Sequence, residues 1–250
     1  MIRKNEVYNM LFSIITTCCN SGKTIERTLD SVSRQTFDDY EYIIVDGGST
    51  DDTLEIIEKY KPIFGSKLTV ISEPDNGIYD AMNKGIKLSK GELIGIVNSD
   101  DYYEPRCLEY VTNEYDSSKP FQIIYGMMRV VNKNQEELSV VFYHHRNLKN
   151  TMISHPASFL TRKLYERYGC YDVAYRSAAD YDFMLKMSEE KDVIFHPVYK
   201  LLTNFTRGGM SETSPGIQEG NKVRYNHKII GKKRYLLTKW KYYLKHALFE

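Results

Sequence analysis

Acidic and amide side chains directly follow two apolar segments of the sequence, where they could bind a charged ligand. The run YIIVD ends in Asp46, and the run LIGIV leads into Asn98, Ser99, Asp100 and Asp101. Clustered carboxylates repel a phosphate group unless a divalent cation lies between them, and such cations prefer carboxylate oxygens. The simplest ligand that satisfies both conditions is a nucleoside diphosphate bridged to the protein by a metal ion.

A parallel sheet would bring these side chains together. Apolar runs alternate with helical patterns: the runs cover residues 11–17, 42–46, 68–72 and 93–98, and the helices follow them over 25–32, 50–60 and 76–89. Continuous Val, Ile and Leu runs between amphipathic helices are typical of a parallel sheet covered on both faces. Ligands bind beyond the carboxyl ends of the strands in such sheets, so we expect Thr17, Asp46 and Asn98 to share one edge.

The pattern changes after about residue 105. A helix, an antiparallel hairpin or meander, a strand, a second helix and one or two strands are predicted in turn, over 105–116, 127–131 with 138–143, 157–161, 180–188 and 193–205. No Pro- or Gly-rich linker separates this part from the first sheet. We therefore expect both parts to form one α/β domain.

The composition excludes several classes of protein. The 34 basic and 33 acidic side chains nearly cancel, which argues against a nucleic-acid binder, and the 13% aromatic content argues against disorder. The four cysteines have neither zinc-ligand spacing nor the density of a disulfide scaffold. No apolar run approaches the roughly 20 residues that cross a bilayer, and the first residues do not resemble a secretory signal. We expect a cytoplasmic protein.

The last part of the chain, residues 219–250, differs in charge and is expected to form a unit separate from residues 1–218. It holds nine Lys or Arg residues and two Glu. Apolar residues, among them Leu236, Leu237 and Trp240, recur at steps of three and four, which predicts a basic amphipathic helix. Such a helix either lies on an anionic membrane, here the inner face of the cell membrane, or packs on the domain with its charges solvated.

Each candidate residue also has a structural interpretation. Asp46 could shape the turn after its strand, and Asp100 or Asp180 could cap a helix N-terminus. His155 precedes a proline, a setting in which a histidine more often has a structural role than a ligand-binding one. The combination of three polar strand ends is what favours a functional site.

Several stretches of the chain, from residue 13 to about 210, resemble family 2 glycosyltransferases with the GT-A fold, of the kind found in bacterial polysaccharide clusters. They are SIITTCCN (13–20), VDGGSTDDT (45–53), EPDNGIYDAMNKGIKLSKGELIGIVNSDD (73–101), SHPASF (154–159) and AADYDFMLKM (178–187). The resemblance implies a mostly parallel, doubly wound sheet with helices on both faces, a small antiparallel element and a C-terminal helical tail. It also implies inverting transfer of a sugar from a nucleoside-diphosphate donor, a UDP-sugar first of all, to a saccharide or lipid-linked saccharide.

The resemblance assigns roles residue by residue. It implies that the nucleotide-sugar is bound by Thr17, Asp46, Asp75, Asp80, Asn83, Asn98 and Ser99. It makes Asp100, with Asp101 beside it, the ligand of Mn²⁺ or Mg²⁺, and Asp180 the catalytic base. The sugar or acceptor side is implied to include His155, Gly208 and Gly209. The chain departs from the family pattern at Asn98, where an acid is usual, and at Ala179, where a glutamate is usual.

The sequence is also compatible with other classes of function. A catalytically silent module could bind a nucleotide-sugar or glycan without turnover, although the retained Asp180 argues against it. A sugar nucleotidyltransferase would carry a glycine-rich loop with Lys or Arg after the first strand, and CCNSGKTIER is not such a loop. A purely structural partner in a synthesis complex would not need the acidic cluster. No sequence feature indicates an oligomeric state.

Overall fold

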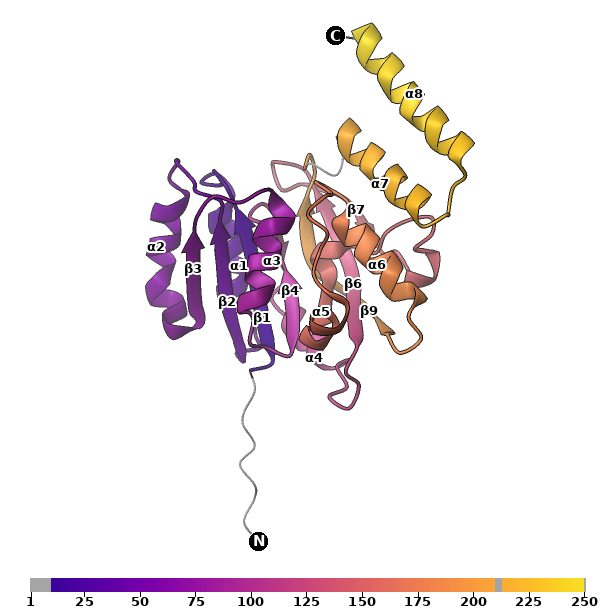
Figure 1. The fold of residues 1–250 in the computed structure, drawn as a ribbon. Helices are drawn as coiled ribbons and strands as arrows, with labels where there is room; N and C mark the ends of the chain where they lie inside the picture. Colours follow the sequence, from indigo (N-terminus) through magenta and orange to yellow (C-terminus); the bar gives the residue numbers. More distant parts are fainter. Residues whose placement is uncertain (1–9, 210–212, 250) are drawn as a thin grey trace.

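One nine-stranded mixed sheet forms the centre of the molecule (Figure 1). The computed structural model describes residues 10–209 and 213–249, with the backbone alone for residues 242–249. The strand order is β3-β2-β1-β4-β8-β6-β9-β5, and β7 pairs with β6 outside this path. The first half of the sheet is parallel, and consists of β1 (Phe12–Cys18), β2 (Tyr40–Asp46), β3 (Leu68–Ser72) and β4 (Leu93–Ile96).

Helices cover both faces of this parallel half. Alternate residues of β1 point to opposite faces, since side chains alternate along a strand. Ile14 packs among the buried residues of α1 (Ile25–Ser33) and α2 (Thr53–Phe64). Ile15 packs with those of α3 (Ile78–Leu88) on the other face. The doubly wound arrangement predicted from the sequence is therefore confirmed.

The second half of the sheet is mixed. The strand β8 (Ser158–Thr161) runs antiparallel between β4 and β6 (Gln122–Val131), and β9 (Ile194–Thr206) runs parallel to β6. The predicted hairpin is present, because β7 (Glu137–Val141) pairs antiparallel with β6. The predicted helices correspond to α4 (Cys107–Thr112) and α6 (Ala179–Glu189).

Three features of this half differ from the expectation. The strand β6 begins at Gln122, five residues before the expected start, where its first five residues are buried in the core. The two-residue strand β5 (Tyr102–Tyr103) and the short helix α5 (Arg162–Tyr168) have no sequence pattern long enough to reveal them. Both are fixed by tertiary contacts, with β5 paired to β9.

The chain ends in two helices, α7 (Ser214–Asn226) and α8 (Lys232–Phe249). The helix α7 begins where the Thr213 hydroxyl accepts a hydrogen bond from the Gly216 N–H, with Pro215 in the first turn. The expected tail segment, residues 219–250, therefore starts inside α7. Its first residue was chosen where the charge of the sequence changes, and this point is not a helix boundary. None of the helices in the described ranges is long and apolar enough to span a membrane, and all four cysteines are free thiols.

Gly95, in the middle of β4, lies where the parallel and antiparallel halves meet. A Cβ atom there would come within 2.7 Å of the Phe159 ring and 2.8 Å of the Tyr103 hydroxyl, both in the core. We expect Gly95→Ala to lower the free energy of unfolding by about 1–3 kcal/mol, since overpacking forces neighbouring groups apart. Urea unfolding followed by circular dichroism measures this, because the single tryptophan, Trp240, is exposed and poorly placed to report on the core.

Gly231→Ala is the matched control, because a Cβ atom at Gly231 would meet no described atom within 4 Å. The two variants should differ clearly in unfolding midpoint. Equal midpoints would show that the core around Gly95 accommodates the added Cβ atom without strain.

Candidate active site

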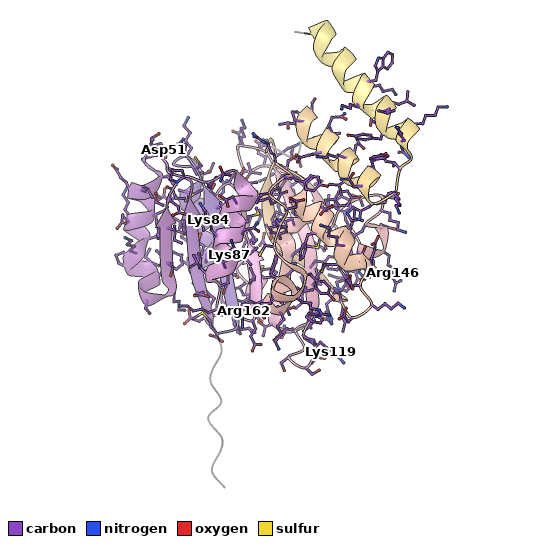
Figure 2. The ribbon with its side chains drawn as sticks, in the orientation of Figure 1. Asp51, Lys84, Lys87, Lys119, Arg146 and Arg162 are labelled. Carbon is purple, nitrogen blue, oxygen red and sulfur yellow. The ribbon has the colours of Figure 1, made fainter. Side chains whose placement is uncertain are left out.

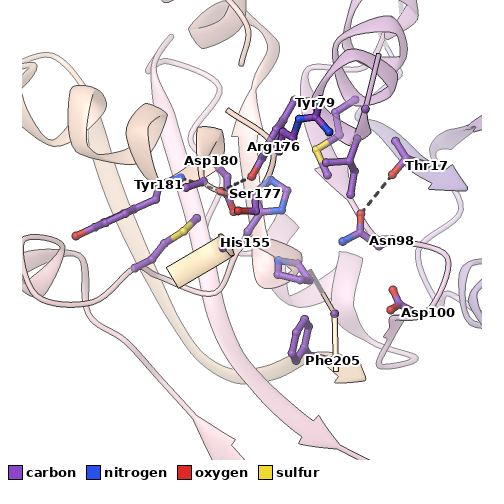
Figure 3. A pocket seen from close by; sticks show the side chains of 18 of the residues that line it. Thr17, Tyr79, Asn98, Asp100, His155, Arg176, Ser177, Asp180, Tyr181 and Phe205 are labelled. Carbon is purple, nitrogen blue, oxygen red and sulfur yellow. Dashed lines mark hydrogen bonds between the residues drawn. The ribbon is translucent and has the colours of Figure 1, made fainter. Parts of the chain in front are cut away.

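A cavity of about 940 Å³ lies at the carboxyl ends of the parallel strands (Figure 3). Its walls come from the ends of β1 and β4, the start of α3, the loop before α6 and one side of α7. Figure 2 shows Asp51, in the turn after β2, at this end of the molecule and Arg162 at the opposite end. The sheet edge expected from the sequence is therefore an edge of the cavity.

The ends of β1 and β4 are joined across the cavity floor. The Thr17 hydroxyl donates to the side-chain oxygen of Asn98 over 3.3 Å, and the Ser21 and Ser99 hydroxyls lie 2.8 Å apart. All four residues line the cavity. Three of the residues expected to bind nucleotide, Thr17, Asn98 and Ser99, are thus brought together.

The turn that carries Asp100 is held from two directions. From α1, the Arg27 guanidinium donates to the Asp100 carbonyl over 2.9 Å, and the Thr28 hydroxyl donates to the Asp101 carbonyl over 2.6 Å. From β9, the Thr206 hydroxyl donates to the same Asp100 carbonyl over 2.5 Å. These backbone contacts leave the Asp100 side chain to face the cavity.

The Asp100 carboxylate is suited to a cation. No other residue in the described ranges donates a hydrogen bond to it, and it is half-buried. Burial raises its pKa above the ordinary value, while the charge of Arg27 opposes the rise. No group of three or more His, Cys, Asp or Glu side chains gathers to hold a metal in the part of the chain described. A metal here would rely on Asp100, the Asn98 amide and ligand phosphates, a minimal set that Mg²⁺ commonly uses.

The Asp101 carboxylate lies in a different environment from that of Asp100. Its side chain is fully buried, and one carboxylate oxygen accepts the backbone N–H of Thr206 over 2.9 Å. Burial, followed by the neighbouring charge of Asp100, raises its pKa well above the ordinary value. Asp101 is not part of the cavity wall, so its geometry is that of an anchor for β9 and not of a metal ligand.

Asp46 is fully buried and does not line the cavity either. Its carboxylate accepts hydrogen bonds from the Ser72 hydroxyl over 2.7 Å, from the Gly48 and Ser49 N–H groups over 3.1 and 3.0 Å, and from the Ser49 hydroxyl. Burial acts to raise its pKa, but these hydrogen bonds outweigh burial and lower it. The structure gives Asp46 the turn-shaping role that the sequence left open.

Three residues of the loop and helix after β3 were expected to bind the nucleotide-sugar, and one of them lines the cavity. Asp75 lines the cavity, and its carboxylate accepts the Gly77 N–H over 3.0 Å. Asp80 instead accepts the Asn76 N–H over 3.0 Å and pairs with Lys84. Asn83 exchanges two hydrogen bonds with the backbone of Tyr171, so it fixes a neighbouring loop and does not reach the cavity.

Asp180 faces the cavity from the side opposite Asp100 (Figure 3). It lies in the first turn of α6, where the helix dipole favours a negative charge. The hydroxyl of Tyr79, a buried residue of α3, donates to its Oδ1 over 2.7 Å. Its Oδ2 has no hydrogen-bond partner among the described residues. Asp180 is therefore a held carboxylate with one oxygen available to a ligand.

His155 lies in the same part of the cavity wall. Its Nε2 is 3.0 Å from the Tyr171 hydroxyl, and burial lowers its pKa although the charge of Asp180 opposes the change. The lowered pKa favours the neutral ring, which forms part of a tyrosine network. Of the two glycines expected on this side, Gly209 lines the cavity and Gly208 lies outside its wall, in the left-handed region at φ +107°.

Several important residues were not predicted from the sequence. They are Arg27, Thr28 and Thr206, which hold the Asp100 turn, Tyr79, which holds Asp180, and Glu219. Glu219 of α7 accepts the N–H groups of Arg176 and Ser177 over 2.6–2.9 Å, directly before α6. The adjacent Arg176 side chain lines the cavity. Tyr79 lies inside one of the recognised stretches, and Thr206 begins the loop TRGGMS (206–211), which also resembles the family. The other three residues stand in no motif.

The sequence of this chain is similar to those of several known proteins. Curated relatives include a "PGL/p-HBAD biosynthesis glycosyltransferase" of Mycobacterium bovis, 32% identical over 81% of this chain and 80% of its own length. The chondroitin synthase of Pasteurella multocida is 32% identical over 72% of this chain, but this match spans only 19% of that enzyme.

Solved structures agree on the fold. S. aureus TarS in complex with UDP-GlcNAc matches 96% of this chain and 74% of its own with a TM-score of 0.67 and 21% identity. The mannosyltransferase PcManGT of Pyrobaculum calidifontis, in complex with GDP-Man and Mn²⁺, matches 95% of this chain and 71% of its own with a TM-score of 0.65 and 18% identity. A longer TarS structure also matches 96% of this chain, but the match spans only 44% of that longer chain. The GT-A fold implied by the sequence is confirmed.

The family model "Glycosyl transferase family 2" matches residues 13–174, which include the ends of β1 and β4 and the strands between them. The match confirms the resemblance found in the sequence. With the cavity, its two facing carboxylates and the shared fold, it establishes that this chain belongs to glycosyl transferase family 2.

Proposed function

We propose that this chain catalyses inverting transfer of a sugar from a UDP-sugar to a saccharide or lipid-linked saccharide, in the synthesis of a polysaccharide or glycolipid. The observation that carries the proposal is that Asp100 and Asp180 face one cavity from opposite sides. A donor diphosphate bound near Asp100 would then present its sugar toward Asp180. The free state of all four cysteines fits a cytoplasmic location.

On the donor side, we assign nucleotide binding to Thr17, Asp75, Asn98 and Ser99. These residues combine hydroxyl, amide and carboxylate groups along one wall of the cavity, and such groups can pair with a base and a ribose. The choice of uridine rests on relatives: the TarS structure holds UDP-GlcNAc. The GDP-Man bound to PcManGT shows that a second nucleotide is compatible with the fold.

We assign the binding of Mn²⁺ or Mg²⁺ to Asp100, with the Asn98 amide beside it. A divalent cation bound there supplies positive charge for the leaving diphosphate. The contribution of the chain is to fix the carboxylate, because Arg27 and Thr206 both hold its own backbone carbonyl. PcManGT was solved with Mn²⁺, which supports the choice of ion.

We assign the role of general base to Asp180. Inversion requires an acceptor hydroxyl to attack the anomeric carbon from the face opposite the leaving group, and the Oδ2 atom of Asp180 can take the proton of that hydroxyl. Tyr79 holds the other oxygen and so fixes the carboxylate plane. His155, Gly209, Arg176 and the inner side of α7 bound the space left for the acceptor.

Asp180→Asn tests the base directly. The amide keeps the size of the side chain but cannot accept the proton, so we expect transfer to fall by about 10²–10⁴-fold. UDP binding, measured by calorimetry, should stay at the wild-type level, because the donor wall is untouched. Near-normal turnover would rule out the base assignment.

Tyr79→Phe tests how Asp180 is positioned. Loss of the 2.7 Å hydrogen bond lets the carboxylate rotate, so we expect kcat to fall by roughly tenfold with an unchanged KM for the donor. Tyr60→Phe on α2 is the matched control, since Tyr60 lies outside this cavity. A rise in KM with an unchanged kcat would instead place Tyr79 in donor binding.

Asp100→Ala tests the metal. Titration of the protein with UDP, with and without Mn²⁺, should show a metal-dependent gain in affinity for the wild type and none for the variant. Asp38→Ala provides the control, because Asp38 is an exposed carboxylate just before β2, at the other end of the sheet. If the variant kept the full Mn²⁺ effect, the metal would have to bind elsewhere.

A further inference from the structure

The described part of α8 has two opposite faces of different character. Tyr235 stacks on Tyr225 of α7 with ring centroids 4.7 Å apart, and the Gln218 side chain donates to the Thr238 carbonyl over 3.2 Å. These contacts occupy one side of the helix. At about 100° per residue, Leu236, Leu237 and Trp240 lie roughly on the opposite side; we call these three residues the apolar ridge.

The apolar ridge is open to solvent. Its three side chains are 49%, 49% and 59% exposed in chain order. Large apolar side chains grouped on one exposed face indicate a surface that something covers. No described residue covers it, because α7 lies on the other side.

The charge around the ridge indicates what covers it. Five of the ten residues from 232 to 241 are Lys or Arg, and none is acidic. On the helical wheel, Lys232 and Lys239 flank the ridge on one side and Arg234 and Lys241 on the other, while Lys233 projects from the ridge itself, between Trp240 and Leu237. All five are exposed. An apolar ridge between two rows of cations matches a helix that lies in the interface of an anionic membrane, whereas a protein groove for it would have to carry acids on both rims.

The position of α8 connects this surface with the active site. The helix α7 forms part of the cavity wall through Gly216, Ile217, Gly220 and Arg224, and carries α8 on another side. Figure 1 shows both helices at the end of the molecule to which the parallel strands point. If α8 binds a surface, only α7 separates α8 from the cavity.

We propose that the apolar ridge and its flanking cations bind the anionic surface of a lipid bilayer, and that the acceptor reaches the cavity from that surface. The second clause rests on the proposed function, and the first does not. Binding is reversible and weakened by salt, because it combines the insertion of three side chains with charge attraction. Each cation near the surface adds roughly fivefold in affinity.

Sedimentation of the whole 250-residue chain with vesicles tests the proposal. We expect binding to vesicles that contain phosphatidylglycerol, weaker binding in raised salt, and little binding to pure phosphatidylcholine. Emission from Trp240, the single tryptophan, should shift to shorter wavelength on binding to the anionic vesicles. The triple variant Leu236→Ser, Leu237→Ser, Trp240→Ser should bind these vesicles at least roughly tenfold more weakly, and Lys232→Glu with Lys239→Glu should also weaken binding.

Two variants on α2 are matched controls. Ile63→Ser removes an apolar side chain that is 61% exposed, and Lys59→Glu reverses an exposed charge. Both should bind vesicles like the wild type. All variants should keep the UDP affinity of the wild type, since none alters the cavity wall.

Three results would overturn the proposal. They are absence of wild-type binding to anionic vesicles, equal binding by the triple variant, and wild-type self-association that the triple variant abolishes without any vesicle binding. The last would mean that a second copy of the chain covers the ridge. A chain that binds vesicles through the ridge but transfers no sugar would support the first clause, and would overturn the proposed function together with the second clause.

Discussion

The placement of the Asp100 carboxylate depends on how the turn after β4 is held. A turn that nothing held in place would let the Asp100 carboxylate rotate away from the cavity. Here α1 and β9 donate to the backbone carbonyls of the turn, through Arg27, Thr28 and Thr206. The first helix and the last strand of the sheet thus meet at one point. The side chain is left for the ligand because the backbone takes the structural contacts.

The architecture followed from the sequence to a large extent. Continuous apolar runs specify buried parallel strands, and the carboxyl ends of parallel strands must share an edge. This is why the sequence alone could place Thr17, Asn98, Ser99 and Asp100 at one edge of the sheet. The strand β5 and the helix α5 were not predicted, because two or seven residues are too few for a periodic pattern. In addition, β5 depends on its pairing with the distant strand β9.

The direction of individual side chains was less predictable. Asp46, Asp80, Asn83 and Asp101 are polar residues in or beside the matching motifs, yet each is held by backbone or side-chain donors outside the cavity wall. A motif tells which residues lie near a site but not which of them face it. Conversely, Tyr79 and Glu219 act through contacts with partners about 100 and 43 positions away in the chain, and no local pattern encodes such a pairing.

The helix α7 belongs to the catalytic body although its charge resembles that of the tail. Glu219 holds the loop before α6, Arg224 donates to the Tyr181 hydroxyl, and His227, just after the helix, pairs with Asp182 of α6. Anyone who builds chimaeras from this protein should therefore join the sequences in the connector over 228–231. A junction at 218 would divide α7 and take away part of the cavity wall, so a hybrid made there would fail for reasons unrelated to its new tail.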